Sequence, residues 1–322
     1  MAGETQTSSL SVDQTAFDRI AYFALRSELL FDQAADVMPT AQAMPGSAVT
    51  FTIFSDLSPA TSTLNEVTDV TPVALSDSQV TVTLAEYGNA VVTTAKLRGT
   101  SFLDVDASAA NIVGFNAGDS IDRVVRDVLA GGSNVSYATG GATDPSSRTT
   151  INTDDLLTAN DVRKEVARLR AANVATFNGA YMGYIHPDVS YDFRSATDAA
   201  AWRTPANYVN PEGIYNGEIG MFEGVRFMES ARAPLFANAS NNSGSTGTID
   251  VYGTLIMGRQ ALAKAVANAA GYGDQPTMVY GEVVDVLKRF QPVGWKHFVG
   301  YGVFRQEALR RIESASSIGT NA

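Results

Sequence analysis

The sequence predicts an α+β fold in which a few amphipathic helices are combined with many strands. Three observations carry this prediction. Two stretches have apolar residues at helical spacing, two others alternate strictly between apolar and polar residues, and turns containing Gly or Pro separate the elements. The chain has 322 residues, of which 45% are hydrophobic. This suffices to bury a core organised as one large domain or two modest ones.

The first helical pattern lies in residues 16–37, where Phe17, Ile20 and Leu30 recur at roughly helical spacing. The stretch before it is polar, and Pro39 follows shortly after it. We therefore expect either a short amphipathic helix or an arm that docks on another surface.

An extended β-hairpin arm is predicted next. Residues 47–57 alternate Val49, Phe51 and Ile53 with threonines, and residues 78–94 begin with the same kind of alternation. Period-two alternation of Val and Thr is typical of strands with one face in water. A long polar stretch with prolines separates the two strands. Because an isolated hairpin is marginally stable in water, we expect this arm to rest on another surface.

Two helices follow. Apolar residues in 104–130 lie at i, i+3, i+4 and i+7 and predict a helix about 40 Å long, which Gly131-Gly132 would end. Gly114 and Gly118 argue against perfect regularity. A second helix is expected at 158–173 with Thr158 as its N-cap, after a Gly/Ser/Asp loop that is a candidate domain boundary.

The remaining elements are short, and no internal repeat is present. We expect a strand at 180–185, a strand–Glu-Gly turn–strand unit within 212–230, a polar loop at 238–248, a strand at 248–258, a short helix at 259–268, and strands within 277–290 and 294–305.

Composition excludes several classes of function. The chain contains no cysteine, so disulfides, thiolate nucleophiles and cysteine-ligated zinc are excluded. The net charge of −11 argues against affinity for nucleic acid as the main role. The N-terminal residues do not resemble a secretory signal, and no apolar stretch approaches the roughly 20 residues of a membrane span.

Charge is unevenly distributed along the chain. No Lys or Arg occurs between Arg26 and Lys96, whereas a basic region near the C-terminus has a single acid, Glu307. The cations of this region are Lys288, Arg289, Lys296, Arg305, Arg310 and Arg311. One interpretation is an ordinary solvated surface. The other is that the acidic arm lies on the basic region of the same chain or of a neighbouring copy.

The candidates for chemistry are weak. His186 lies near Asp188 and Asp192, but Pro187 cannot donate to a strand ladder, so the histidine more simply marks the end of a strand. Asp154-Asp155 could bind a metal or, more simply, begin a helix. Zinc-binding HExxH, GxSxG, phosphate-loop and dinucleotide-binding patterns are absent. We therefore expect no catalytic, cofactor-binding or metal-binding residue.

The order of elements carries a resemblance. The stretches VRKEVARLRAANVATFNGAYMGYIHPDVSYDF, GEIGMFEGVRFMES, YGTLIMGRQALAKA and VGYGVFRQEALRRIESAS occur in this order. Together they resemble the major capsid proteins of tailed bacteriophages, in particular those of phages that infect actinobacteria. The resemblance covers nearly the whole chain.

The resemblance implies the tailed-phage major capsid fold. Its parts would be an N-terminal arm at 1–44, an extended loop at 45–95, a peripheral domain with a long spine helix at 96–155 and 272–322, and an axial domain at 156–271. Some members of the family join subunits through a Lys–Asn bond. Because residues 27–95 contain no lysine, we expect no such crosslink from the extended loop.

The resemblance also implies a function without catalysis. The chain would assemble with copies of itself, as hexamers and pentamers, into an icosahedral virion shell that encloses double-stranded DNA without sequence-specific binding. Assembly would take place in the host bacterial cytoplasm, with scaffolding, portal and decoration proteins as further partners and no membrane. An encapsulin-like compartment shell shares the fold and is an alternative. An α/β enzyme and a tail or adhesin binding module are alternatives of other classes.

Overall fold

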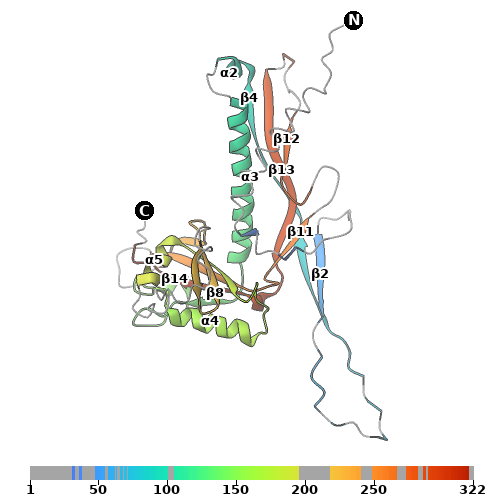
Figure 1. Cartoon of the computed structure of the whole chain (residues 1–322), viewed down its shortest axis with the longest axis vertical. Coiled ribbons are helices and arrows are strands. Elements are labelled where there is room, and N and C mark those ends of the chain that lie inside the picture. The colour runs from blue at the N-terminus through green and yellow to red at the C-terminus, as the bar shows by residue number, and fades with distance from the viewer. Residues whose placement is uncertain are drawn as a thin grey trace.

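The computed structural model combines a long upright unit, a smaller unit beside its base and a projecting hairpin (Figure 1). It describes residues 31–32, 36–37, 48–54, 57–61, 63, 66–67, 69–70, 72–100, 105–195, 218–240, 249–266, 273–281, 286–287 and 289–318. Within these residues helices and strands are mixed, as an α+β fold requires.

The upright unit is built around helix α3 (Val105–Ala130), which confirms the predicted long helix. Its buried side includes Val113, Ala117, Ile121 and Val125 at intervals of four residues. The glycines of this helix lie on the same buried side and do not interrupt it. The helix ends at Ala130, and the N–H of Gly131 then donates to the carbonyl of Asp127 at 3.0 Å.

A five-stranded sheet lies along α3. Its strands are ordered β1-β11-β13-β12, and β4 also pairs with β13. The bounds are β1 (Asp36–Val37), β4 (Ala85–Thr94), β11 (Leu262–Val266), β12 (Thr277–Tyr280) and β13 (Phe290–Val303). Short helix α2 (Ala95–Thr100) connects β4 toward α3 at the far end of the unit (Figure 1). The 14-residue strand β13 is the common partner of β4, β11 and β12.

One sequence prediction is wrong in this sheet. The segment predicted as a helix at 259–268 contains strand β11, which pairs antiparallel with β13. Ala has a high helix propensity, but intrinsic propensity is a weak determinant, and pairing with the long strand β13 overrides it. The helix predicted at 16–37 lies mostly outside the described residues, but its last two residues form β1, parallel to β11.

The smaller unit contains a seven-stranded sheet. Its order is β5-β14-β10-β6-β8-β7, and β9 pairs with β10. The bounds are β5 (Val135–Tyr137), β6 (Tyr181–Ile185), β7 (Glu218–Phe222), β8 (Val225–Glu229), β9 (Leu235–Ser240), β10 (Ile249–Met257) and β14 (Leu309–Ser314). The strands predicted at 180–185 and 248–258 are thereby confirmed.

Helices α4 (Ala159–Ala171) and α5 (Pro187–Ser195) belong to this unit, together with the 3-10 turns η2 (Arg148–Thr150) and η6 (Gln306–Ala308). The predicted N-cap is confirmed, since Thr158 accepts from the N–H of Asp161, and the Asp161 carboxylate accepts from the N–H of Thr158 at 3.1 Å. The predicted Glu-Gly turn is also confirmed. Glu223 and Gly224 both have positive φ, the conformation that a tight two-residue hairpin between β7 and β8 needs.

The two sheets do not follow the ranges predicted from the sequence. The closing strand β14 and strand β5 lie in the sheet of the smaller unit, although 96–155 and 272–322 were grouped with the spine helix. Strand β11, from the range 156–271, pairs with β13 instead. The chain therefore crosses between the units more often than single boundaries in the sequence suggest.

Candidate assembly surfaces

The extended arm is a two-stranded hairpin of β2 (Ala48–Phe54) and β3 (Asp77–Thr83). Phe51 and Val82 are buried while the threonines between them are exposed, so the predicted alternation is confirmed. The predicted strand 78–94 is divided at Leu84, where the chain leaves β2 and continues as β4 against β13. The arm is thus a direct extension of the upright unit.

Glycines of β13 hold the base of the arm. Phe51, Val82 and Leu84 pack against Ala263 and Ala265 of β11. A Cβ at Gly300 would lie 2.5 Å from the carbonyl oxygen of Thr83, and one at Gly302 would lie 2.8 Å from a methyl of Val82. The hairpin crosses β13 at a distance that only glycine permits.

Beyond its base the arm projects away from the rest of the chain (Figure 1). Its described residues carry exposed apolar side chains: Phe54, Leu57, Val67, Val70, Val73 and Leu75, of which Val67 is 92% exposed. Glu66, Asp69 and Asp77 are exposed on the same segment, which contains no Lys or Arg. We call residues 57–77 the arm tip. An exposed apolar surface of this kind marks an interaction site.

A second apolar surface lies at the far end of the upright unit. It is formed by exposed side chains of β4, α2, α3 and the segment leading into β13: Val91, Val92, Leu97, Ile112, Val286, Leu287 and Phe290. Lys96 and Arg289 lie within the same segments, and the Arg289 guanidinium is 5.5 Å from the centre of the Phe290 ring. We call this set the spine-tip surface.

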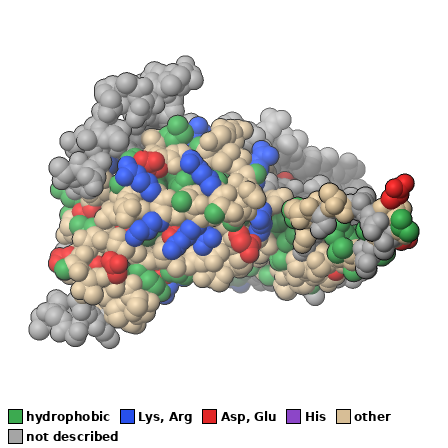
Figure 2. Space-filling model, turned by 90° about the horizontal axis from the view of Figure 1, so that it is seen from below, with side chains coloured by type: hydrophobic (Ala, Val, Ile, Leu, Met, Phe, Trp, Pro, Cys, Tyr) green, Lys and Arg blue, Asp and Glu red, His purple; other side chains and the backbone are tan. Residues whose placement is uncertain are grey.

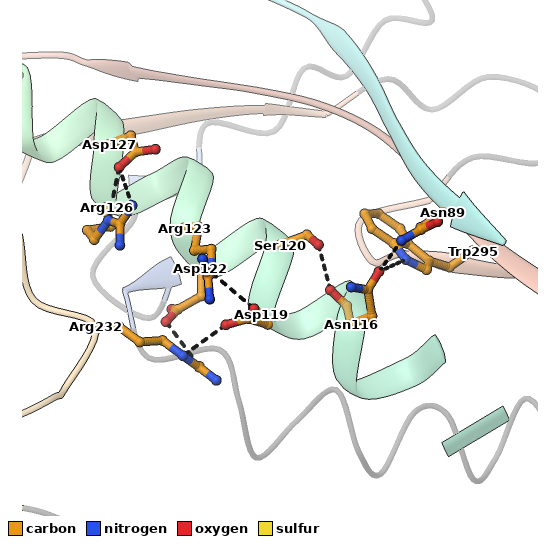
Figure 3. Close-up of polar contacts among 10 residues, drawn as sticks. All are labelled: Asn89, Asn116, Asp119, Ser120, Asp122, Arg123, Arg126, Asp127, Arg232 and Trp295. Atoms are coloured by element: carbon orange, nitrogen blue, oxygen red, sulfur yellow. Dashed lines mark hydrogen bonds and ion pairs between the residues drawn. The ribbon is translucent and has the colours of Figure 1, made fainter. Parts of the chain in front are cut away.

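Polar contacts fix α3 between the two units (Figure 3). The Asn116 side-chain oxygen accepts from the indole N–H of Trp295 at 3.0 Å and from the amide of Asn89 at 3.2 Å. Further along the helix, Arg232 of the smaller unit is 2.9 Å from Asp119 and 3.5 Å from Asp122. The helix is therefore held to the five-stranded sheet on one stretch and to the smaller unit on another.

The N-terminal segment forms a contact that the sequence did not predict. Phe31 is fully buried, with its ring 4.6 Å from that of Tyr184, and its N–H donates to Asp122 at 3.0 Å. Asp32 accepts from the ammonium of Lys264 at 3.0 Å and from the hydroxyl of Tyr301 at 2.9 Å. We call Phe31 and Asp32 the N-arm anchor. It touches the smaller unit, α3 and the five-stranded sheet at one point.

The basic C-terminal region requires a correction. Arg310 lies 3.9 Å from Glu165, and Arg311 lies 2.9 Å from Glu313; both arginine side chains are largely buried. Glu313 also receives two hydrogen bonds from Arg148, at 2.9 and 2.6 Å. These arginines hold the smaller unit together and are not part of an open basic surface. Lys288 lies outside the described residues.

The predicted interpretation of His186 agrees with its place in the fold. It follows β6 directly, and Pro187 is the first residue of α5, where a missing N–H costs nothing. Its Nδ1 is 3.4 Å from Asp188, which accepts from the hydroxyl of Tyr252 at 2.8 Å. Burial lowers the pKa of His186 and raises that of Tyr252. These contacts join α5 to β10.

Asp154 and Asp155 do not begin a helix, because α4 starts at Ala159. Asp155 is fully buried and accepts from the N–H of Asn152 at 2.6 Å, so it shapes the loop before α4. Burial raises the pKa of its carboxyl. Among the described residues, no three His, Asp or Glu side chains are grouped as a metal site would require. No helix in the same part of the chain is long and apolar enough to span a membrane.

Comparison with known proteins places the chain in a family. The model of the phage capsid protein family matches residues 6–318. No curated protein sequence matches the chain.

Solved structures share the fold at low sequence identity. The capsid of Ralstonia phage GP4 superposes with a TM-score of 0.73 at 14% identity, covering 92% of this chain and 94% of that one. A structure from Mycobacterium phage Che8 gives 0.56 at 17% identity and coverage of 88% and 90%. The SrpI encapsulin of Synechococcus elongatus gives 0.51 at 12% identity and coverage of 77% and 80%. These likenesses establish the tailed-phage major capsid fold.

The family match spans nearly the whole chain, the fold is that of solved phage capsids, and two apolar surfaces project where a partner would cover them. The chain therefore belongs to the phage capsid protein family and is a major capsid protein, a structural component of a virion shell.

Proposed function

We propose that copies of this chain assemble as hexamers and pentamers into an icosahedral shell that encloses double-stranded DNA. The observation that carries the proposal is the arm tip, whose described apolar and acidic side chains are exposed on a segment that projects away from the two units. A second copy supplies the simplest cover, because a homo-oligomer repeats the same contact around a closed ring.

The surface best suited to receive the arm tip is the spine-tip surface of the next copy. Both surfaces expose apolar residues, so their contact removes apolar area from water. The arm tip contributes acids, whereas Lys96 and Arg289 accompany the apolar residues of the spine tip. Of the basic C-terminal region, Arg289 thus belongs to the proposed contact, whereas Arg310 and Arg311 are occupied within the fold.

The parts of the chain then take distinct roles. The five-stranded sheet and α3, at about 85–130, 262–266 and 273–303, form the peripheral domain. The seven-stranded sheet with α4 and α5, at about 131–257 and 305–318, forms the axial domain near the centre of each capsomer. Residues 1–44 act as the N-terminal arm. We further propose assembly in the host bacterial cytoplasm, with scaffolding, portal and decoration proteins as partners, and no catalytic activity.

Negative-stain electron microscopy with light scattering of the full chain tests the proposal. We expect closed shells or capsomer rings. In a variant with Val67→Asp and Val73→Asp the arm tip loses apolar surface, and the yield of such particles should fall at least tenfold. The matched control, Thr61→Asp with Thr63→Asp, adds the same charge to the same segment but removes no large apolar side chain, so it should assemble. Equal assembly by both variants would show that the arm tip is not the contact.

The likeness to an encapsulin keeps a compartment shell as the second candidate. The contents of particles from the native source distinguish the two. Nuclease-resistant DNA inside the particle supports the virion, whereas a protein cargo without DNA supports the compartment.

A further inference from the structure

One face of the smaller unit is basic although the whole chain has a net charge of −11. Helix α4 lies at the lower boundary of the smaller unit in Figure 1, and the view from below in Figure 2 shows Lys and Arg side chains gathered on this unit with fewer acids among them. We call this the basic α4 face. Its cations are Arg163, Lys164, Arg168, Arg170, Arg226, Arg259 and Arg305.

Ion pairs and hydrogen bonds bring cations from separate segments of the chain together on this face. Arg163 reaches the β7–β8 turn, where it binds Glu223 at 2.9 Å, and the guanidinium of Arg170 lies beside Gly224 of the same turn. Arg305 donates to the carbonyl of Ala172 at 2.9 Å, just after α4. The N–H of Arg259 donates to Ala175 at 2.9 Å. The face therefore continues past the C-terminal end of the helix.

The nearby carboxylates offset only part of the charge of this face. Glu165 and Asp161 are buried beneath the helix, where Glu165 pairs with Arg168 and Arg310, and Asp161 caps the helix and lies 3.9 Å from Lys164. The exposed acids beside the cations are Glu223 and Glu307, which bind Arg163 and Arg305.

Two arginines of the face keep their charge uncompensated. Arg170 and Arg259 form no ion pair with any residue that the structure describes, and both are exposed. The exposed guanidinium of Arg170, on the capped helix α4, can therefore bind an external anion.

The composition of the face distinguishes between classes of partner. Cores of protein–protein interfaces are depleted in charged residues, and protein–DNA interfaces are far more positive and more polar. Helix α4 presents none of the large exposed apolar side chains of the described residues, although Met221, opposite Arg226 in the β7–β8 hairpin, is exposed near the face. Six of the seven cations are arginine, the side chain that binds phosphate through two parallel hydrogen bonds.

We infer that the basic α4 face binds the phosphate backbone of double-stranded DNA without reading its sequence. The inference rests on the proposed function, in which the shell encloses such DNA, and it makes this face the one directed at the genome. The remaining acidic surface would repel the duplex, so the contact is confined to one patch on each subunit.

Fluorescence anisotropy of a labelled 30-base-pair duplex tests the inference, using the unassembled full chain at increasing salt. The variant is Lys164→Gln with Arg170→Gln and Arg259→Gln. The control, Arg194→Gln with Arg123→Gln and Arg126→Gln, removes the same charge from α5 and the spine helix, outside both proposed contact surfaces. Each lost phosphate contact lowers the salt slope by about 0.9. We expect the first variant to bind at least tenfold more weakly in 50 mM salt, with a lower slope, and the control to bind like the wild type.

Several outcomes would overturn the inference. These are an absence of DNA binding by the wild type at low salt, an equal loss in both variants, or a variant that binds normally. Circular dichroism checks that each variant is folded, and light scattering records assembly independently. Shells that form without affinity for DNA would refute this inference alone. DNA binding by a chain that never assembles would refute the proposed shell instead. A variant that loses assembly while the wild type ignores DNA would identify the face as a contact with a second copy or another acidic protein.

Discussion

The ammonium of Lys264 lies 3.0 Å from the carboxylate of Asp32, although the two residues are 232 positions apart in the sequence. Both side chains are largely buried, and Tyr301 completes the contact from β13. Together with Phe31, this pair fastens the N-terminal segment where the two units meet. Fully burying an apolar side chain of the size of Phe31 stabilises a fold by about 1.5–3 kcal/mol.

Lys264→Met should therefore destabilise the chain through the charge it leaves behind. Asp32 would remain buried without its cation, and breaking a buried pair costs about 3 kcal/mol or more. Denaturant unfolding of the full chain measures this loss. In the double variant with Asp32→Asn, no charge is left unpaired, so part of the stability should return. Lys96→Met, at an exposed site, is the control and should change the unfolding free energy by less than about 0.5 kcal/mol.

Stability should fall between about pH 6.5 and pH 4 because of His297. This side chain is almost fully buried, and burial lowers its pKa to about 4, with Lys264 lowering it further and Asp32 and Asp274 opposing. In the unfolded chain the pKa is near 6.5, so between these values the unfolded state binds more protons. The contribution of His297 to the free energy of unfolding is thus fully present above pH 6.5. It decreases as the pH falls toward 4, and below that value stability depends no further on this group.

The loss attributable to His297 amounts to at most about 3 kcal/mol, at 1.36 kcal/mol per pH unit. Thermal unfolding across this pH range, compared with His297→Gln, measures it. The variant should show a flatter profile with a small remaining slope, because burial also lowers the pKa of His186. Identical profiles for the two proteins would contradict the assignment.

Glu313 and Glu307 form a matched pair for a third prediction. Glu313 is 1% exposed and holds both Arg148 and Arg311, whereas the Glu307 side chain is 58% exposed beside Arg305. Glu313→Gln should cost about 3 kcal/mol or more of stability, because the buried Arg311 and the partly exposed Arg148 both lose their counter-charge. Glu307→Gln should cost less than about 1 kcal/mol. Denaturant midpoints of the two variants give the comparison directly.

Gly300→Val should separate the arm from its base. The added side chain would meet the Thr83 carbonyl and Val82, so the hairpin must shift away from β13. We expect protease cleavage of the arm to become at least several-fold faster while α3 and the smaller unit remain protected. Gly99→Ala is the control, since a Cβ there meets nothing within 4 Å in helix α2. Unchanged cleavage of the arm in Gly300→Val would show that the crossing does not fix the arm.

Local patterns predicted the elements well wherever one face of an element was buried. The alternation of Val49 and Phe51, the stripe of α3, and the caps at Thr158 and Gly131 all follow from short-range rules. Segment 259–268 was mistaken for a helix because Ala-rich sequence is compatible with both states, and only its pairing with β13 decides between them. The grouping into domains depends on such distant pairings as well.

The functional surfaces also depend on contacts that local sequence patterns do not reveal. The exposed valines of the arm tip lie between the strands, in a stretch predicted only as polar, so this apolar surface was not anticipated. The N-arm anchor could not be anticipated either, because Asp32 meets Lys264 only after the chain has folded. One signal was present: a lone lysine among the apolar residues of a short segment. The basic α4 face could not be predicted because its cations come from segments that are distant in the sequence. Conversely, Arg310 and Arg311 are adjacent in the sequence but face different carboxylates inside the fold.

The register between β4 and β13 has a mechanical consequence. The arm continues through Leu84 into β4, and ten residues of β4 pair in unbroken register with β13. A pull along the arm therefore loads these backbone hydrogen bonds in parallel, in shear, and not one after another as in peeling. If neighbouring subunits grip each other through the arm tip, outward pressure on the wall would be borne by a seam that must rupture all at once.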